Sequence, residues 1–146
     1  MDTIIAKIRS AKRGWLVALV VWVFFIWGNS LVPGDASSEE SGLILELLSP
    51  LIRTLGVADM DAAHTFIRKC GHFSEYLVLA LLAWKVFDRE ALAAAVAIGI
   101  AVPCIDETIQ RFVPGRCGVV GDVLIDCAGF AVGTVLCLLA WRRRSS

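Results

Sequence analysis

The sequence predicts an all-α membrane protein, a four-span transmembrane helical bundle with a short interfacial amphipathic helix. Two observations carry this prediction. Apolar residues make up 58% of the chain without counting glycine, and the mean hydropathy is +0.73. Soluble domains contain only about 45–50% apolar residues even with glycine included, so a chain this short would expose too much apolar surface in water. In addition, apolar runs close to membrane-crossing length recur along the chain.

The apolar runs predict one membrane domain covering residues 1–146. Its four spans are expected at about residues 15–32, 66–87, 91–111 and 122–141. The first run approaches the ~20 residues that cross the hydrocarbon core, and we expect an anchor rather than a cleaved signal peptide. The second and third runs are apolar over a shorter stretch, so they reach crossing length only by including polar residues at one end. The fourth is long enough but carries Asp122 and Asp126 in its first turns.

A shorter helix is expected between the first two spans, at about residues 38–55. Pro33 and Gly34 should end the first helix, because proline fixes φ and glycine permits turn geometry. Ser37 and Glu40 fit a capping box at the start of the next helix. Leucine and isoleucine then alternate with polar residues at helical spacing. The apolar part is too short to span, so this helix should lie on the membrane surface.

Basic residues set the expected orientation. The larger group flanks the side that holds both termini: Lys7, Arg9, Lys12, Arg13, Lys85, Arg89, Arg142, Arg143 and Arg144. The smaller group flanks the other side: Arg53, Arg68, Lys69, Arg111 and Arg116. Because basic residues near span ends prefer the cytoplasm, both termini should be cytoplasmic, with a tight inner turn at residues 88–90. The totals of 14 Lys+Arg and 14 Asp+Glu cancel, so no basic field is present to bind nucleic acid.

This topology gathers polar side chains, most of them ionisable, at the outer ends of three spans. They are His72 and Glu75 on the second span, Asp106, Glu107 and Gln110 on the third, and Asp122 and Asp126 on the fourth. An ionised group at membrane depth costs about 3 kcal/mol, so these residues should face inward and find partners. Gly129 and Gly133 form a small-x-x-x-small contact that lets two helices approach closely. An ion-pair network with the nearby cations is one interpretation, but apolar packing would hold the helices at lower cost, so we favour a functional site.

The same residues resemble a known family. The segments Lys69-x-x-His72-Phe73-x-Glu75-Tyr76, Asp106-Glu107-x-x-Gln110-x-Phe112-x-Pro114-Gly115-Arg116, and Asp122 with Asp126 and Gly129 are similar in order and spacing to the VanZ-like family. The resemblance covers about residues 15–140 and includes Asn29-Ser30 and the serines at 37, 38 and 41. Where many relatives carry Asn, this chain has Asp126, which replaces an amide donor by a charged acceptor. The resemblance implies a small multi-span protein of the bacterial cytoplasmic membrane, whose namesake is tied to low-level teicoplanin resistance. It implies no particular reaction.

The first functional hypothesis is a protein that binds or modulates an envelope lipid or lipopeptide at the outer face of the membrane. Its partners would be membrane lipids, a lipid-linked envelope precursor or a glycopeptide antibiotic. Basic side chains would contact a phosphate or carboxylate, and carboxylates would accept sugar or amine protons. The expected ligand-binding residues are Lys69, His72, Glu75, Asp106, Glu107, Gln110, Arg116, Asp122 and Asp126.

The second hypothesis is a metal-dependent intramembrane enzyme acting on a lipid-linked phosphate or acyl substrate. The candidate ligands for its divalent metal are His72, Asp106, Glu107 and Asp122. The metal would polarise an oxygen of the substrate, with Glu75 or Glu107 as the catalytic base. No recognised hydrolase motif supports this chemistry. A proton pathway is a third alternative, but the inner halves of the spans lack polar residues.

The five cysteines show no zinc-type spacing. Cys127 and Cys137 are expected to pack as small apolar residues. The other three, Cys70, Cys104 and Cys117, could share one membrane face, so a disulfide between two of them stays an alternative, as does any oligomeric state.

Overall fold

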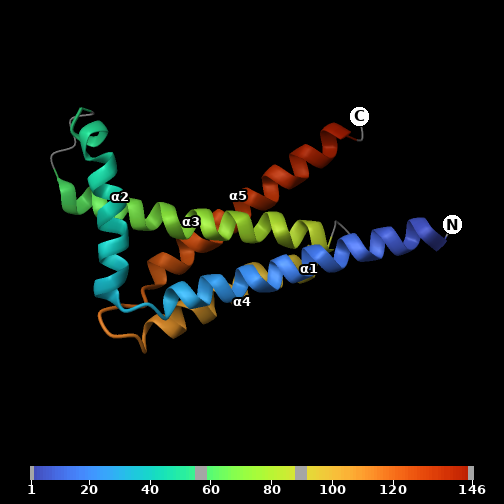
Figure 1. Cartoon of the computed structure of the whole chain (residues 1–146), viewed down its shortest axis with the longest axis horizontal. Helices are drawn as coiled ribbons and strands as arrows, with labels where there is room; N and C mark the ends of the chain where they lie inside the picture. Colours follow the sequence, from blue (N-terminus) through green and yellow to red (C-terminus); the bar gives the residue numbers. More distant parts are fainter. Residues whose placement is uncertain (1, 55–58, 88–91, 145–146) are drawn as a thin grey trace.

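Helices form nearly all of the computed structural model, which describes residues 2–54, 59–87 and 92–144. Their order is α1 (Asp2–Ser30), α2 (Gly34–Thr54), α3 (Met60–Phe87), α4 (Leu92–Gln110) and α5 (Val120–Arg144). Figure 1 shows α1, α3, α4 and α5 running lengthwise, with α2 set across one end and both termini at the other. The all-α prediction is confirmed. The expected inner turn at residues 88–90 lies outside the described residues.

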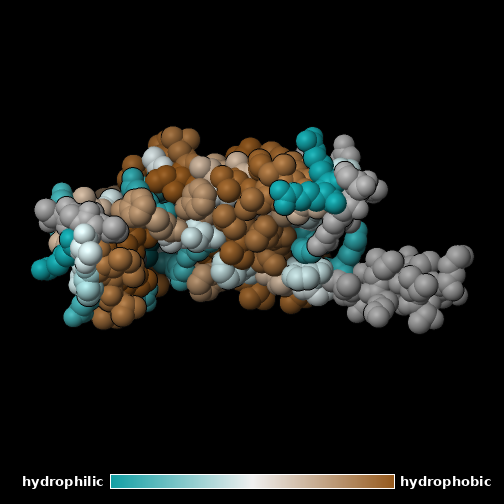
Figure 2. Space-filling model, turned by 90° about the horizontal axis from the view of Figure 1, so that it is seen from above, coloured by the Kyte–Doolittle hydropathy of each residue, from teal (hydrophilic) through white to brown (hydrophobic). Residues whose placement is uncertain are grey.

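Three of the described helices are long and apolar enough to cross a membrane. The qualifying stretches are Lys12–Ser30 in α1, Ala93–Gln110 in α4 and Val120–Arg143 in α5. Helix α3, predicted as a further span, is polar over its first half and apolar over its second. Figure 2 shows a broad apolar belt around the middle of the molecule, with hydrophilic side chains gathered toward the two ends. These features are those of a membrane protein.

The closest helix pair is α3 with α5, and glycines make it close. A Cβ on Gly129 would collide with the carbonyl oxygen of Phe73, and a Cβ on Gly133 would lie 2.7 Å from the carbonyl oxygen of Leu77. One turn along α5 therefore corresponds to one turn along α3, so the two helices run parallel. The predicted small-residue contact on the last helix is confirmed, and α3 is its partner.

Helix α1 runs parallel to α4 and antiparallel to α3. The indole N–H of Trp27 donates to the Val102 carbonyl at 3.5 Å, and one turn later Ser30 reaches α4 at Asp106. In contrast, the ammonium of Lys85, near the end of α3, lies 5.6 Å from the ring centroid of Trp15 in the middle of α1, whereas Trp22, later in α1, donates to the carbonyl of Glu75, earlier in α3. The four long helices thus alternate in direction along the chain, as consecutive crossings of one layer would.

Helix α2 begins at Gly34, earlier than the predicted start near residue 38. The Gly34 N–H donates to the Pro114 carbonyl at 3.0 Å, and a Cβ on Gly34 would collide with Gly115, whose φ is +73°. Ser37 therefore lies inside the helix, where its N–H donates to the Pro33 carbonyl at 3.0 Å, and the predicted capping box is wrong. The start is set by packing of two glycines that are distant in sequence.

Helix α2 is also tied to the first turns of α3. The hydroxyl of Ser41 lies 2.8 Å from Nε2 of His64, and the N-terminus of α3 is capped by Asp59, whose Oδ1 accepts the N–H groups of Asp61 and Ala62. The outward side of α2 is apolar and exposed, with Leu47 80% exposed. Helix α2 therefore presents leucines away from the bundle at the end opposite the termini.

Candidate functional site

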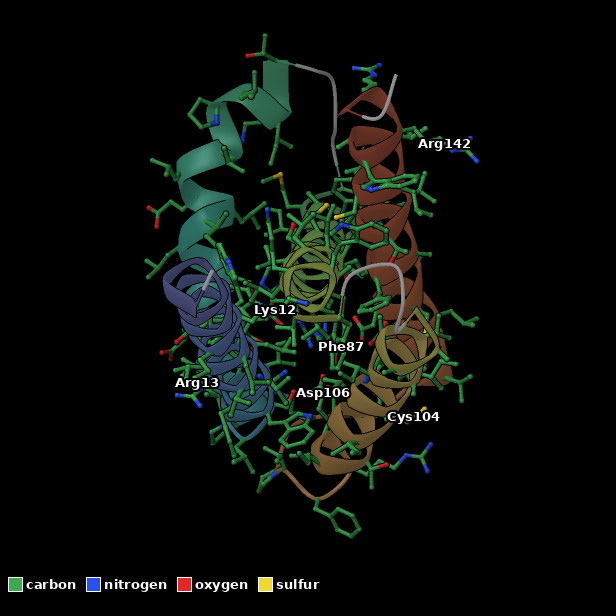
Figure 3. The ribbon with its side chains drawn as sticks, turned by 90° about the vertical axis from the view of Figure 1, so that its right-hand side faces the viewer. Lys12, Arg13, Phe87, Cys104, Asp106 and Arg142 are labelled. Carbon is green, nitrogen blue, oxygen red and sulfur yellow. The ribbon has the colours of Figure 1, made fainter. Side chains whose placement is uncertain are left out.

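The polar residues predicted to face inward are buried at the α2 end of the bundle. Asp106 and Asp126 are 0% exposed, Gln110 is 2% exposed and Glu107 is 3% exposed. Figure 3, viewed along the bundle, shows Asp106 pointing between the helices while Cys104, on the same helix, points outward. We call this set, together with His72 and Glu75, the polar cluster. Helices α3, α4 and α5 bring part of the predicted set together, since donor atoms of His72, Asp106 and Asp126 lie within 4.8 Å of one another. The other predicted residues on α3 and α5, Glu75 and Asp122, are half-buried.

His72 and Asp126 face each other across the close contact of α3 and α5. Nδ1 of His72 lies 3.4 Å from Oδ1 of Asp126. The distance is that of an ion pair, but the two groups are not aligned for a hydrogen bond, so His72 Nδ1 and both carboxylate oxygens of Asp126 have no hydrogen-bond partner among the described residues. Gly129, one turn after Asp126, is pressed against the backbone of Phe73, the residue next to His72. The glycine contact therefore sets the two side chains against each other.

Asp106 is held from two sides. The Ser30 hydroxyl, at the end of α1, donates to its Oδ1 at 2.6 Å, and the Gln110 side-chain amide donates to its Oδ2 at 3.3 Å. The same amide also donates to the Ser30 hydroxyl oxygen at 3.2 Å. The phenol oxygen of Tyr76, which is fully buried, has no hydrogen-bond partner among the described residues. The orientation of the Asp106 carboxylate is thus fixed by neighbours that leave room for a further ligand.

The two predicted catalytic carboxylates each accept one hydrogen bond. Oε1 of Glu75 accepts the side-chain amide of Asn29 at 2.8 Å, and the Glu75 carbonyl accepts the indole N–H of Trp22 at 2.9 Å. Oε2 of Glu107 accepts the backbone N–H of Val119 at 2.8 Å, which anchors the loop before α5. The other oxygen of Glu107 is buried without a partner in the described structure.

Arg116 binds backbone carbonyls instead of the carboxylates of the polar cluster. Its Nε donates to the Val32 carbonyl at 2.9 Å and its Nη2 to the Asn29 carbonyl at 2.8 Å, at the C-terminal end of α1 where carbonyls lack helix partners. Burial, followed by the positive charge of Arg68, lowers the pKa of Arg116, while nearby carboxylates oppose that effect. The predicted guanidinium over the site is therefore partly committed to holding the loop of residues 111–119 onto α1.

The expected ion-pair network is not formed within the described residues. His72 with Asp126 is the one acid–base pair within 4 Å described there, and Lys69 and Arg68 are exposed cations without a carboxylate at that distance. The acids of the polar cluster are therefore not neutralised by the nearby basic residues. This outcome favours the site interpretation over the structural one.

Two pockets open next to the polar cluster, and both are lined by Arg68 and His72. The first has a volume of about 200 Å³ and lies between α1, α2 and α3. Its other polar lining residues are Asn29, Ser30, Ser37, Glu40, Ser41, Glu75 and Arg116. The second has a volume of about 250 Å³, and its lining includes Lys69, Asp122, Thr65 and Cys117. His72 thus connects the buried acids with both pockets.

Three of these side chains could hold a metal ion. One donor atom each from His72, Asp106 and Asp126 lies within 4.8 Å of the other two. Two of the four predicted metal ligands belong to this group. Of the other two, Glu107 is turned to the Val119 N–H, and Asp122 lines the second pocket, so Asp126 completes the group.

A family model described as VanZ/LLP1 matches residues 15–141. The chain belongs to the VanZ/LLP1 family. The match runs from the first turns of α1 that carry apolar residues to the end of α5 and includes the whole polar cluster. No curated protein and no solved structure matches the chain significantly. The predicted family is thereby confirmed.

Three supporting residues of this VanZ/LLP1 protein were not among the predicted site residues. Ser30 and Asn29 hold Asp106 and Glu75 from α1, and Tyr76 turns its hydroxyl into the polar cluster. The sequence does contain a signal for Asn29 and Ser30, because these two polar residues interrupt an otherwise apolar run. The five cysteines are free thiols, so the disulfide considered among Cys70, Cys104 and Cys117 is absent.

Proposed function

We propose that this VanZ/LLP1 protein crosses the bacterial cytoplasmic membrane four times, with α3 as the remaining span and both termini in the cytoplasm. The alternating directions of the four long helices and the common end of the two termini support an even number of crossings (Figure 1). Asp61, Arg68 and Lys69, the charged side chains in the first turns of α3, are exposed, so in this topology they would lie at the level of the lipid headgroups and not in the hydrocarbon core. The polar cluster then lies toward the outer face, beneath α2.

We further propose that the protein binds the phosphate headgroup of an envelope lipid at that face. The observation that carries this proposal is the pair of cations at the pocket mouths. Arg68 lines both pockets, Lys69 lines the second, and neither has a carboxylate partner within the described residues. Arginine and lysine are the usual protein partners of phosphate oxygens. Glu75 and Asp122 lie behind them, where they can accept hydroxyl or amine protons of the same headgroup.

The pocket sizes support a headgroup rather than a whole lipid. Pockets that enclose drug-sized ligands measure about 300–1,000 Å³, whereas these measure about 200 and 250 Å³. Acyl chains would remain in the membrane, next to the exposed leucines of α2, such as Leu43 and Leu47. A helix with an apolar outer face and a polar inner one suits the membrane surface.

Native mass spectrometry of the full chain tests this proposal. Protein is released from nanodiscs of phosphatidylglycerol mixed with phosphatidylcholine, and the retained lipids are counted. The variant Arg68→Gln should retain about tenfold less phosphatidylglycerol, because one charge-assisted hydrogen bond contributes about 1.5–3 kcal/mol. The control is Arg53→Gln, at the exposed end of α2 and outside both pockets. Equal retention by all three proteins, or no preference over phosphatidylcholine, would contradict headgroup binding.

The cellular consequence we propose is low-level resistance to teicoplanin. A lipid-anchored glycopeptide acts on lipid-linked targets at the outer face, where this pocket would lie. Cells producing the wild-type protein should tolerate more teicoplanin than cells producing Arg68→Gln at the same protein level, with vancomycin as the comparison drug. Equal sensitivity would remove the antibiotic from the proposal without affecting lipid binding.

A second candidate function is a metal-dependent enzyme acting on a lipid-linked phosphate or acyl substrate. The grouped donors of His72, Asp106 and Asp126 favour it, because a bound cation next to a phosphate-sized pocket would polarise a substrate oxygen. Water would attack the terminal phosphorus while Glu75, a predicted base that lines the first pocket, would take a proton from the water, and the P–O bond to the remaining lipid phosphate would break. Release of phosphate from a lipid pyrophosphate by purified protein, abolished by Glu75→Gln, is the expected result. No release with Zn²⁺, Mn²⁺ or Mg²⁺ present would reject this function.

A further inference from the structure

We propose that His72, Asp106 and Asp126 form a divalent-cation site, with Tyr76 beside it and its open side toward the two pockets. The site differs from the one the sequence predicted, because Asp126 takes the place of Glu107 and Asp122. It does not rest on headgroup binding. A cation would sit next to both pockets, where it would add to the hydrogen bonds of Asp106 and contact atoms of His72 and Asp126 that make none.

The strongest evidence is the state of Asp126. Its side chain is fully buried, and neither carboxylate oxygen has a hydrogen-bond partner in the described structure. Burying a polar group without a partner costs several kcal/mol, and more for a charged one. His72 Nδ1 and the Tyr76 hydroxyl are buried and unpartnered at the same place. His72 Nδ1 and Asp126 Oδ1 are 3.4 Å apart, within ion-pair distance, but neither makes a hydrogen bond. A cation is a partner that carboxylate oxygens and an imidazole nitrogen can share.

The distances fit donors that surround one ion. Donors bound at about 2.0–2.2 Å in a tetrahedron lie about 3.3–3.6 Å from one another. Nδ1 of His72 and Oδ1 of Asp126 are 3.4 Å apart. The widest donor spacing in the group is within 4.8 Å, so a small rotation of a carboxylate brings the third donor into range. Two donors that are 3.4 Å apart and not aligned for a hydrogen bond are thus also spaced as two ligands of one ion would be.

The surroundings of Asp106 resemble those of a metal-bound carboxylate. Ligating side chains are usually oriented by hydrogen bonds from residues behind them. Ser30 and Gln110 each donate to one oxygen of Asp106, while each oxygen keeps a free lone pair. The supporting donors come from α1 and α4, and the three ligands come from α3, α4 and α5. All four long helices therefore contribute to the site.

Charge and ligand type indicate which cation would bind. Two carboxylates and a neutral imidazole carry a charge of about −2, and Arg116 is directed to backbone carbonyls instead. A divalent ion therefore neutralises the group. One nitrogen and two oxygens suit Zn²⁺ or Mn²⁺ better than Ca²⁺, which takes six to eight oxygens. Three protein ligands leave a position open, as catalytic and ligand-exchanging zinc sites do.

Equilibrium dialysis of the full chain in detergent micelles tests the inference. Because Cys70, Cys104 and Cys117 are exposed thiols that bind Zn²⁺ themselves, the three are first replaced by serine. The protein is stripped with a chelator and dialysed against Zn²⁺ or Mn²⁺ in buffer free of phosphate and lipid. We expect about one ion per chain and at least tenfold weaker binding by Asp126→Asn, which keeps the shape of the side chain.

The control is Asp61→Asn, an exposed carboxylate in the first turn of α3, which should bind like the parent. A parent protein that retains no more metal than empty micelles would overturn the inference, as would equal binding by Asp126→Asn. If Asp126→Asn does not fold, Asp106→Asn gives the same comparison, and the parent measurement alone still decides. A parent protein that binds metal but shows no preference for phosphatidylglycerol over phosphatidylcholine would reject the headgroup proposal and leave the cation site standing.

Discussion

The α3–α5 contact has two halves with opposite chemistry. Toward the termini it is apolar and closely packed, with Gly133 on α5 against Leu77 and Ala80 on α3. Toward α2 it is polar and unsatisfied, with His72 facing Asp126. The same helix-to-helix distance serves both halves. The apolar half is closely packed and buries no polar side chain that needs a partner, whereas the polar half contains buried hydrogen-bond donors and acceptors without partners among the described residues.

This difference indicates that the apolar half stabilises the fold and that the polar half forms the candidate site. If the polar half served stability alone, its acids would be paired with Arg68 and Lys69, whereas the one acid–base pair of this half among the described residues is His72 with Asp126. The apolar half brings the helices together, and the consequence is that Asp126 is forced against His72. A variant in the apolar half should therefore change the free energy of unfolding but not the metal affinity, and a variant in the polar half should mainly change the metal affinity.

The largest effect is expected from Gly129→Leu, which acts on both halves. The side chain would collide with the backbone of Phe73, and backbone cannot rotate away. We expect a loss of about 3 kcal/mol in the free energy of unfolding, together with loss of metal binding. The matched control is Gly28→Leu, where nothing lies within 4 Å of the added Cβ. If the two variants unfold in micelles with equal free energies, the contact of Gly129 with Phe73 does not hold α3 and α5 together, and it cannot be what positions the site.

Leu79→Ala should weaken the apolar half alone. Leu79 is fully buried between the helices, so its truncation leaves a cavity and costs about 2 kcal/mol of unfolding free energy. Metal affinity should stay within about twofold of the parent, because the free energy of binding is set at the other end. Leu81→Ala, on an exposed face of α3, is the control for stability. A large loss of metal affinity in Leu79→Ala would show that the halves are not separable.

Ser30→Ala should act on the polar half alone. It removes the 2.6 Å hydrogen bond to Asp106, so zinc should bind about tenfold more weakly while the unfolding free energy falls by about 1 kcal/mol. Ser74→Ala is the matched control, since that hydroxyl bonds only the Cys70 carbonyl on its own helix. Unchanged zinc affinity in Ser30→Ala would mean that α1 does not orient the ligand.

The smallest effect is expected from Ser41→Ala, which touches neither half. The variant loses the 2.8 Å contact with His64 that links α2 to α3, at a cost of about 0.5–1 kcal/mol. Hydrogen exchange should accelerate in α2 and stay unchanged in α3 and α5. Faster hydrogen exchange in α3 and α5 as well would instead show that the contact of α2 with α3 stabilises the whole bundle.

The sequence predicted the inward-facing acids because ionisable groups in apolar segments have few alternatives. His72, Asp106 and Asp126 each border a long apolar stretch of their helix, so the predicted topology was enough to place them at the same end of the bundle. The same reasoning located the glycine contact at Gly129 and Gly133. Both are local patterns whose consequences depend little on loops.

The partners of those residues could not be predicted, because they depend on how loops return to the bundle. Arg116 was expected over the site, but the turn at Gly115 packs on Gly34 and directs the guanidinium to the carbonyls of Asn29 and Val32. The same packing moves the start of α2. Asp126 was not chosen as a metal ligand, since the direction of α5 against α3 decides that His72 meets it rather than Asp122.

Thermal unfolding of the wild-type protein and Asp126→Asn, each with Zn²⁺ and with a chelator, tests the central claim most directly. The claim is that the buried acids are stabilised by a bound cation rather than by the protein. With chelator, Asp126→Asn should unfold at the higher temperature, because a neutral amide replaces an unpaired buried carboxylate. With Zn²⁺ the order should reverse, because only the wild-type site binds the ion tightly. An order that is the same in both conditions, with no response of the wild-type protein to Zn²⁺, would contradict the account.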